Sequence, residues 1–160
     1  MIKNKPLLLD HPSEKWQFDG LPSYRMKQVR EWIFEKGTLN FEKMSNLPLG
    51  LRQGLEKKWD LMPMEVVREQ GARDTTQKFL WKLRDQQFIE SVLIPATQGT
   101  KGVRASRLTL CVSTQVGCAL GCKFCASGLE GLKRKLSTGE ILGPIILARH
   151  KAGKRIDNLV

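Results

Sequence analysis

Apolar residues recur at helical spacing in the first third of the chain. Ser23 is placed to begin one helix and Gly37 to end it, because serine favours N-cap positions and glycine favours C-terminal ones. Pro48 is placed to begin a second helix, since proline is tolerated in a helix's first turn. We expect the apolar faces of these helices to pack together, and residues 1–20 to form a loose N-terminal arm. The two faces consist of Met26, Val29, Trp32, Ile33, Leu51, Leu55 and Trp59.

The spacing of apolar positions changes in the middle of the chain to an alternation with a period of two. Phe79, Trp81 and Leu83 alternate with other residues, a polar turn follows at 84–87, and a second apolar run returns. This pattern predicts a β-hairpin. Residues 98–106 contain glycine and lysine and predict a loop.

The last third of the chain predicts one β–loop–α–β unit, which is typical of a parallel sheet. Alternation over residues 108–113 predicts a strand that carries Cys111 on the face opposite its leucines. Ser137 and Glu140 have the spacing of a capping box at the start of a helix. Residues 156–160 predict the beginning of another strand.

These elements predict an α/β fold built from three consecutive parts. Residues 1–62 form a small helical accessory domain, residues 63–99 form β-hairpin strands that lead into a core, and residues 100–160 begin that core. Pro144 lies inside the predicted helix of the third part and should kink or shorten it, because proline removes a backbone hydrogen bond.

The charge of the chain favours a polyanionic partner. The 160 residues carry a formal net charge of +11, and most of the excess lies after residue 99. Lysine and arginine cluster at 133–135 and again at 149–155, where phosphate contact and simple solvation are both open interpretations.

Neither a secretion signal nor a membrane span is expected. The apolar run behind the first lysines is only three residues long, and the longest apolar stretch, 141–148, is far below the roughly 20 residues that cross a bilayer. We expect a soluble, cytoplasmic protein. In a reducing compartment its four cysteines are expected to act as metal ligands or reactive thiols rather than as structural disulfides.

Three cysteines share one short loop. Cys118, Cys122 and Cys125 are separated by three and then two residues, and they lie among glycines that allow a tight turn. A zinc site usually takes a second pair of ligands from a distant knuckle, and no second pair is present. An iron–sulfur cubane can be held by three cysteines and then keeps one iron open to another ligand. A structural zinc site is the other possibility.

The loop, with Phe124 before its last cysteine, resembles the cysteine loop of the radical S-adenosylmethionine enzymes. The run from Arg107 to Cys125 is more narrowly similar to the adenine methyltransferases of the RlmN/Cfr type. The Glu90-Ser-Val-Leu-Ile-Pro95 run resembles the upstream strand of that family, and Tyr24 to Trp59 resembles its helical accessory domain. The resemblance covers the chain from residue 21 onward.

The resemblance implies roles for individual residues. Cys118, Cys122 and Cys125 would bind a [4Fe-4S] cluster, whose open iron is chelated by S-adenosylmethionine. The other roles follow the family motif in the same way: Phe124 would lie near the cofactor adenine, Glu90 would accept a proton from the adenine carbon of the substrate, and Cys111 would resolve the enzyme–RNA adduct by forming a disulfide. Without the resemblance, Phe124 would be expected to pack in the core, Glu90 to be a solvent-facing strand residue, and Cys111 to be a small buried strand residue.

The resemblance also implies substrates and partners. It indicates a dual-specificity methyltransferase that methylates C2 of adenine in 23S rRNA and in tRNA. The sequence alone does not decide between C2 and C8 as the methylated carbon. An external electron donor and a monomeric state are expected. The first β–loop–α–β unit would open a truncated partial (β/α) barrel, because the chain ends at Val160. The resemblance also implies a second catalytic cysteine near the C-terminus, which becomes methylated, and this chain has no cysteine after Cys125. We therefore expect this chain alone not to complete the reaction. A non-catalytic RNA-binding module that holds zinc is the alternative.

Overall fold

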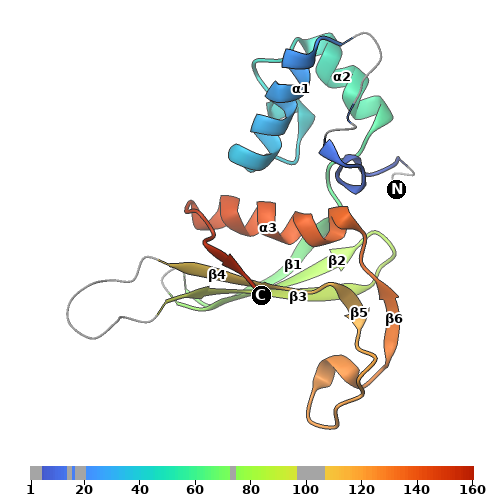
Figure 1. The fold of residues 1–160 in the computed structure, drawn as a ribbon, viewed down its shortest axis with the longest axis vertical. Helices are drawn as coiled ribbons and strands as arrows, with labels where there is room; N and C mark the ends of the chain where they lie inside the picture. Colours follow the sequence, from blue (N-terminus) through green and yellow to red (C-terminus); the bar gives the residue numbers. More distant parts are fainter. Residues whose placement is uncertain (1–4, 14–15, 17–20, 73–74, 97–106) are drawn as a thin grey trace, which may run out of the picture.

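The computed structural model describes residues 5–13, 16, 21–72, 75–96 and 107–160. A helical part lies at one end of the molecule, and a twisted sheet lies at the other (Figure 1). Helix α3, Thr138–Ala152, runs between them. The loop that the sequence predicts at 98–106 lies outside the described residues.

The helical part contains the two helices that the sequence predicts. Helix α1, Ser23–Arg30, follows Pro22 in the N-cap position and continues as a π-helix over Glu31–Glu35. Helix α2, Leu49–Lys58, begins after Pro48. Short 3-10 turns at Leu8–Asp10 and Phe41–Lys43 complete this part. The expected apolar faces meet in one core, to which each helix contributes: Met26, Val29, Ile33 and Leu55 are buried there, with Trp32, Leu51 and Trp59 against it.

The prediction of a loose N-terminal arm is wrong for the described residues of that segment. Leu8 and Leu9 are each only 1% exposed and belong to the core of the helical part. Their backbone is also fixed, because Leu8 N–H donates to the carbonyl of Asp60 at 2.9 Å and Asp60 N–H donates to that of Pro6 at 3.0 Å. Burying a large leucine side chain stabilises the arm by about 1.5–3 kcal/mol, and this contribution comes from contacts with the helical part.

The main sheet has five strands in the order β1–β2–β3–β4–β7. The first three pairs are antiparallel, and β4 and β7 are parallel. The predicted hairpin is confirmed as β2 and β3. The fold is a mixed α/β structure whose main sheet is mostly antiparallel and contains one parallel unit, β4–α3–β7. The strand bounds are β1, Met64–Gln70; β2, Gln77–Leu83; β3, Phe88–Pro95; β4, Leu108–Val112; and β7, Asn158–Leu159.

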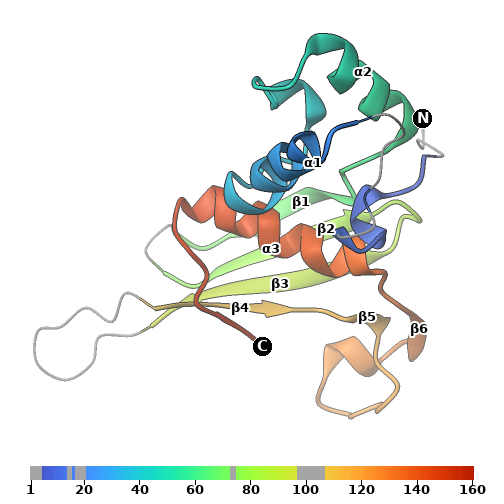
Figure 2. The same cartoon turned by 45° about the horizontal axis from the view of Figure 1, so that its top comes forward.

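Helix α3 covers one face of the sheet and also contacts the helical part (Figure 2). Ala148 joins the core of the sheet, whereas Ile146 joins the core of the helical part. The capping box predicted at Ser137 and Glu140 is present. Pro144 does not shorten the helix, which continues to Ala152, and its ring is fully buried, so that packing offsets the lost hydrogen bond. No helix among the described residues is both long and apolar enough to span a bilayer.

Candidate functional site

The three-cysteine loop is carried by a small hairpin that projects from the end of the sheet (Figure 1). Its strands are β5, Gln115–Gly117, and β6, Leu132–Lys135, and they pair antiparallel. This hairpin was not predicted from the sequence. The loop starts directly after β5, which itself follows β4 within two residues, so the cysteines lie beyond the carboxyl end of β4.

Glycines close the base of this loop. Gly117 has a φ of +74°, and a Cβ atom there would lie only 2.0 Å from the carbonyl oxygen of Gly131. Only glycine fits this close approach without moving the backbone. The N–H of Cys118 donates to the same carbonyl at 3.2 Å, and the N–H of Cys125 donates to that of Cys122 at 3.0 Å. The loop therefore returns to its own start through backbone contacts.

The three thiols are free and partly exposed. Within the described ranges, no three side chains of His, Cys, Asp or Glu are grouped so as to hold a metal ion. The donor set nevertheless has the right chemistry, because thiolates are the ligands of iron–sulfur clusters and of structural zinc. The assignment of Cys118, Cys122 and Cys125 as ligands therefore rests on residue type and spacing.

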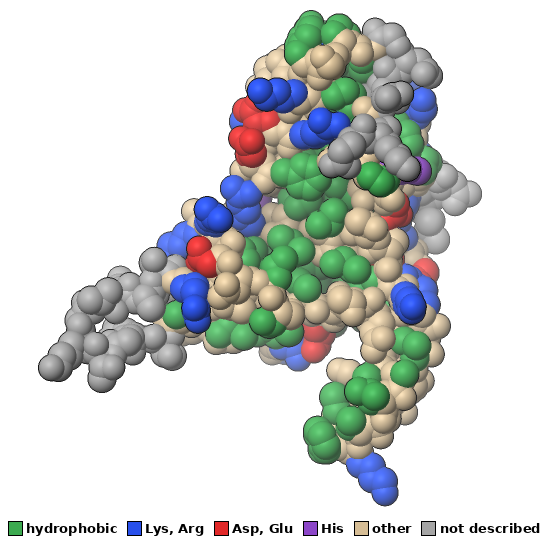
Figure 3. Space-filling model, in the orientation of Figure 1, with side chains coloured by type: hydrophobic (Ala, Val, Ile, Leu, Met, Phe, Trp, Pro, Cys, Tyr) green, Lys and Arg blue, Asp and Glu red, His purple; other side chains and the backbone are tan. Residues whose placement is uncertain are grey.

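The loop presents an apolar surface to solvent. Phe124 is 93% exposed, and Leu120 and Leu129 are 82% and 75% exposed. Figure 3 shows hydrophobic side chains along the projecting hairpin. The exposure of Phe124 excludes the interpretation that it packs in the core of this chain, so its ring is available to contact another molecule.

Glu90 and Cys111 lie on the same face of the main sheet. Leu110 and Ile89 are buried on the face that α3 covers, and each strand alternates, so the residues next to them point to the opposite face. In the β3–β4 register Val92 is opposite Cys111, which makes Glu90 a diagonal neighbour of Cys111. Such neighbours are about 7–8 Å apart. The Nζ atom of Lys78 lies 2.7 Å from the Glu90 carboxylate.

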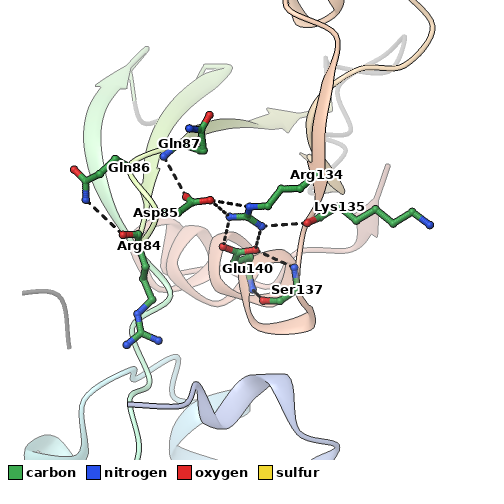
Figure 4. Close-up of polar contacts among 8 residues, drawn as sticks. All are labelled: Arg84, Asp85, Gln86, Gln87, Arg134, Lys135, Ser137 and Glu140. Carbon is green, nitrogen blue, oxygen red and sulfur yellow. Dashed lines mark hydrogen bonds and ion pairs between the residues drawn. The ribbon is translucent and has the colours of Figure 1, made fainter. Parts of the chain in front are cut away.

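Arg134 connects the hairpin of β5 and β6, which we call the cysteine hairpin, to the rest of the molecule (Figure 4). Its Nη1 and Nη2 atoms donate to the two carboxylate oxygens of Glu140, and its Nε atom donates to Asp85 at 2.7 Å. Asp85 belongs to the turn between β2 and β3, and Glu140 belongs to the first turn of α3. A single guanidinium on β6 thus joins the hairpin, the sheet and the helix.

The charges of this cluster shift one another's pKa. The hydrogen bond from Arg134 has the largest effect on Asp85 and lowers its pKa. Burial opposes this effect, and the N–H of Gln87 lowers the pKa further. Burial raises the pKa of Glu140, but the hydrogen bonds from Arg134 and from the N–H of Ser137 more than offset it, so that the pKa of Glu140 is also lowered. The pKa of Arg134 is raised by the same two carboxylates, Glu140 first.

Two of the three basic side chains at 133–135 are paired with carboxylates. Arg134 is engaged by Asp85 and Glu140, and Lys133 Nζ lies 2.5 Å from the Glu130 carboxylate. Sequence reasoning missed the role of Arg134 because its two acidic partners come from other elements.

Comparisons with known proteins support the resemblance. Residues 19–61 match the family described as "Ribosomal RNA large subunit methyltransferase N-terminal domain". The chain is 50% identical over 141 residues to a "Probable dual-specificity RNA methyltransferase RlmN" of Akkermansia muciniphila. The resemblance to the RlmN type is confirmed. A "Dual-specificity RNA methyltransferase RlmN" of Nitratiruptor is also similar, with 37% identity over 147 residues.

A solved structure extends the likeness to the fold. The radical SAM methyltransferase of Sphaerobacter thermophilus is 35% identical, with a TM-score of 0.81, over 96% of this chain and 45% of its own length. The RlmN relatives of Akkermansia and Nitratiruptor match over 88% and 89% of this chain, which covers 39% and 41% of their lengths. The chain thus spans about two fifths of the length of the curated RlmN relatives that it matches.

Proposed function

We propose that this chain supplies the first part of a dual-specificity RNA methyltransferase that acts on adenine in 23S rRNA and in tRNA, with C2 as the methylated carbon. One observation carries the proposal: a chain similar over most of its length to RlmN proteins places a Cys-x3-Cys-x2-Cys loop just beyond β4. The β4–α3–β7 unit would then be the first unit of a partial (β/α) barrel.

Three thiols of the loop would hold the resident cofactor. Cys118, Cys122 and Cys125 would each bind one iron of a [4Fe-4S] cluster, whose fourth iron stays open for S-adenosylmethionine. When bound, the cluster supplies the electron that cleaves S-adenosylmethionine reductively. The exposed ring of Phe124 would offer an apolar surface to the adenine of S-adenosylmethionine.

Glu90 and Cys111 would act on the RNA substrate from the uncovered face of the sheet. Their diagonal position in the β3–β4 register supports a shared task, because both side chains can approach one substrate atom. Glu90 would accept the proton from the adenine carbon, and Lys78 would hold the carboxylate on this face. Cys111 would resolve the enzyme–RNA thioether by forming a disulfide with the sulfur of the cysteine that carried the methyl group, a cysteine that is not among the four of this chain.

The expected partners follow from this chemistry. We propose that ribosomal RNA and tRNA are the substrates, that an external electron donor reduces the cluster, and that the protein is a cytoplasmic monomer. The formal net charge of +11 supports the RNA partners, because Lys and Arg side chains neutralise phosphates.

Anaerobic reconstitution tests the cofactor assignment against the zinc alternative. The purified chain is incubated with iron, sulfide and reductant, and a second sample is incubated with zinc. We expect about four irons and about four sulfides per chain and a broad visible absorption. Stoichiometric zinc binding, with no iron retained after desalting, would instead support a non-catalytic RNA-binding module.

A further inference from the structure

A hollow of about 250 Å³ lies where the helical part meets the end of α3. Residues from two distant parts of the sequence line it, one group at the end of the π-helix that follows α1 and the other in the last turn of α3 and just beyond. In Figure 3, Lys and Arg side chains gather on the left, below the helical part and near the end of α3. The lining consists of Glu35, Lys36, Gly37, Arg149, His150, Gly153, Lys154 and Arg155.

Direct contacts fix the two sides of the hollow against each other. Gly37 has a φ of +66°, and a Cβ atom there would lie 3.2 Å from the Cβ of His150, so the backbones approach closely. The Nη1 atom of Arg149 donates to the carbonyl of Phe34 at 2.5 Å. The hollow is therefore built by packing between the helical part and α3, not by the chance approach of two loops.

The lining carries a marked positive excess. Four cationic side chains face one carboxylate, that of Glu35. Lys36 is partly neutralised, because it lies 3.3 Å from the Glu31 carboxylate and 4.0 Å from the Trp32 ring centroid. Lys154 and Arg155 are exposed, and in the part of the chain that the structure describes neither makes a hydrogen bond or an ion pair.

The side chains, and not the end of α3, supply the attraction for an anion here. The C-terminal end of α3 contributes a partial negative charge of about half an electron, which opposes anion binding. Even with Lys36 paired to Glu31, the side chains that line the hollow keep an excess of two positive charges, which is larger than this partial charge. Lys154 and Arg155 follow Gly153, which ends the helix in the left-handed conformation at a φ of +62°, and they stand beyond its terminal carbonyls.

We propose that this hollow binds the phosphodiester backbone of the RNA substrate, and that Lys154 and Arg155 neutralise phosphates there. The inference rests on the proposed RNA methyltransferase function and adds to it a binding site shared by the helical part and α3. It differs from the expectation for the 133–135 run, whose arginine is already engaged by carboxylates.

The test measures binding of a labelled tRNA transcript to the chain between about 50 and 200 mM salt. The double variant Lys154→Ala/Arg155→Ala should bind on the order of tenfold more weakly at low salt. Its slope of log affinity against log salt should also be shallower by about two, one for each lost phosphate contact. The matched control is Lys43→Ala/Lys57→Ala, which removes the same charge from exposed positions outside the hollow.

The outcomes separate this site from the wider function. Weaker binding and a shallower slope in the first variant alone support the phosphate site. If both double variants weaken binding equally, net charge explains the effect and the site is wrong. If the wild-type chain binds tRNA and the first variant binds it unchanged, the site is also wrong while the proposed function stands. A wild-type chain that binds no RNA would overturn both.

Discussion

Arg134 donates one hydrogen bond to each carboxylate oxygen of Glu140, at 2.7 and 2.8 Å. Glu140 also accepts from the N–H of Ser137 at 2.9 Å and is thereby part of the cap of α3. One carboxylate thus stabilises the start of the helix and holds the arginine of the cysteine hairpin. Paired, two-point contacts of this kind fix orientation as well as distance.

Replacing Glu140 should therefore destabilise the fold. Its side chain is 8% exposed, and Glu140→Gln leaves the Arg134 guanidinium without its principal charge partner. We expect the free energy of unfolding in urea to fall by about 2–3 kcal/mol. Glu130→Gln is the matched control, because the 74% exposed Glu130 pairs with Lys133 on the surface, and it should leave stability unchanged. Equal effects of the two variants would mean that the cluster is not a major stabilising contact.

The same cluster predicts a loss of stability in acid. The pKa of Glu140 in the folded chain lies below its ordinary value of 4.5, so folding favours the carboxylate. The stabilisation is complete above pH 4.5 and is lost as the pH falls through the lowered pKa. In urea unfolding at pH 7 and pH 3, wild type should lose more stability than Glu140→Gln. Parallel losses in the two proteins would contradict this linkage.

Two glycines of the cysteine hairpin should respond differently to alanine. At Gly117 a Cβ would meet the carbonyl oxygen of Gly131 at 2.0 Å, whereas at Gly121, with a φ of +59°, it would meet nothing within 4 Å. Gly121→Ala should lower the free energy of unfolding by only about 1–2 kcal/mol, the strain of a non-glycine residue in the left-handed conformation. Gly117→Ala should also break the hydrogen bond of the Cys118 N–H. Amide hydrogen exchange checks this: loss of protection at Cys118 is expected only in Gly117→Ala, and retained protection there would show that the hairpin tolerates the change.

Elements with strong periodicity could be predicted from the sequence. The alternation of Phe79, Trp81 and Leu83 identified β2, and the Ser137–Glu140 spacing identified the start of α3. Strand β1 was missed because only its first residue, Met64, is buried, so it shows no alternation. Hairpin β5–β6 was missed because its strands have only three and four residues, too few to show a period.

The candidate site was only partly accessible to sequence reasoning. Cysteine spacing selected the three candidate ligands, because their chemistry depends on local positions. The role of Arg134 depends on Asp85, which lies 49 positions earlier, and no local pattern reports such a contact. The packing of Leu8 and Leu9 against the helical part is likewise a tertiary effect that the composition of residues 1–20 does not indicate.

Single cysteine variants should distinguish the proposed ligands from the fourth thiol. Cys118→Ala, Cys122→Ala and Cys125→Ala should each abolish stable iron binding after reconstitution, since each removes one thiolate of the cluster. Cys111→Ala is the control, because Cys111 lies on β4 outside the loop, and it should retain the iron content of wild type. If Cys111→Ala lost iron as completely as the loop variants, a four-cysteine site would be indicated and the open iron would be excluded.

The open iron itself is tested most directly by electron paramagnetic resonance of the reconstituted and reduced chain, recorded with and without S-adenosylmethionine. Three protein ligands leave one iron free, so S-adenosylmethionine should shift the signal of the reduced cluster, and S-adenosylhomocysteine provides the comparison without the methyl group. A shift on adding S-adenosylmethionine is the predicted result. A cluster signal that S-adenosylmethionine leaves unchanged would contradict the assignment of this loop to radical S-adenosylmethionine chemistry.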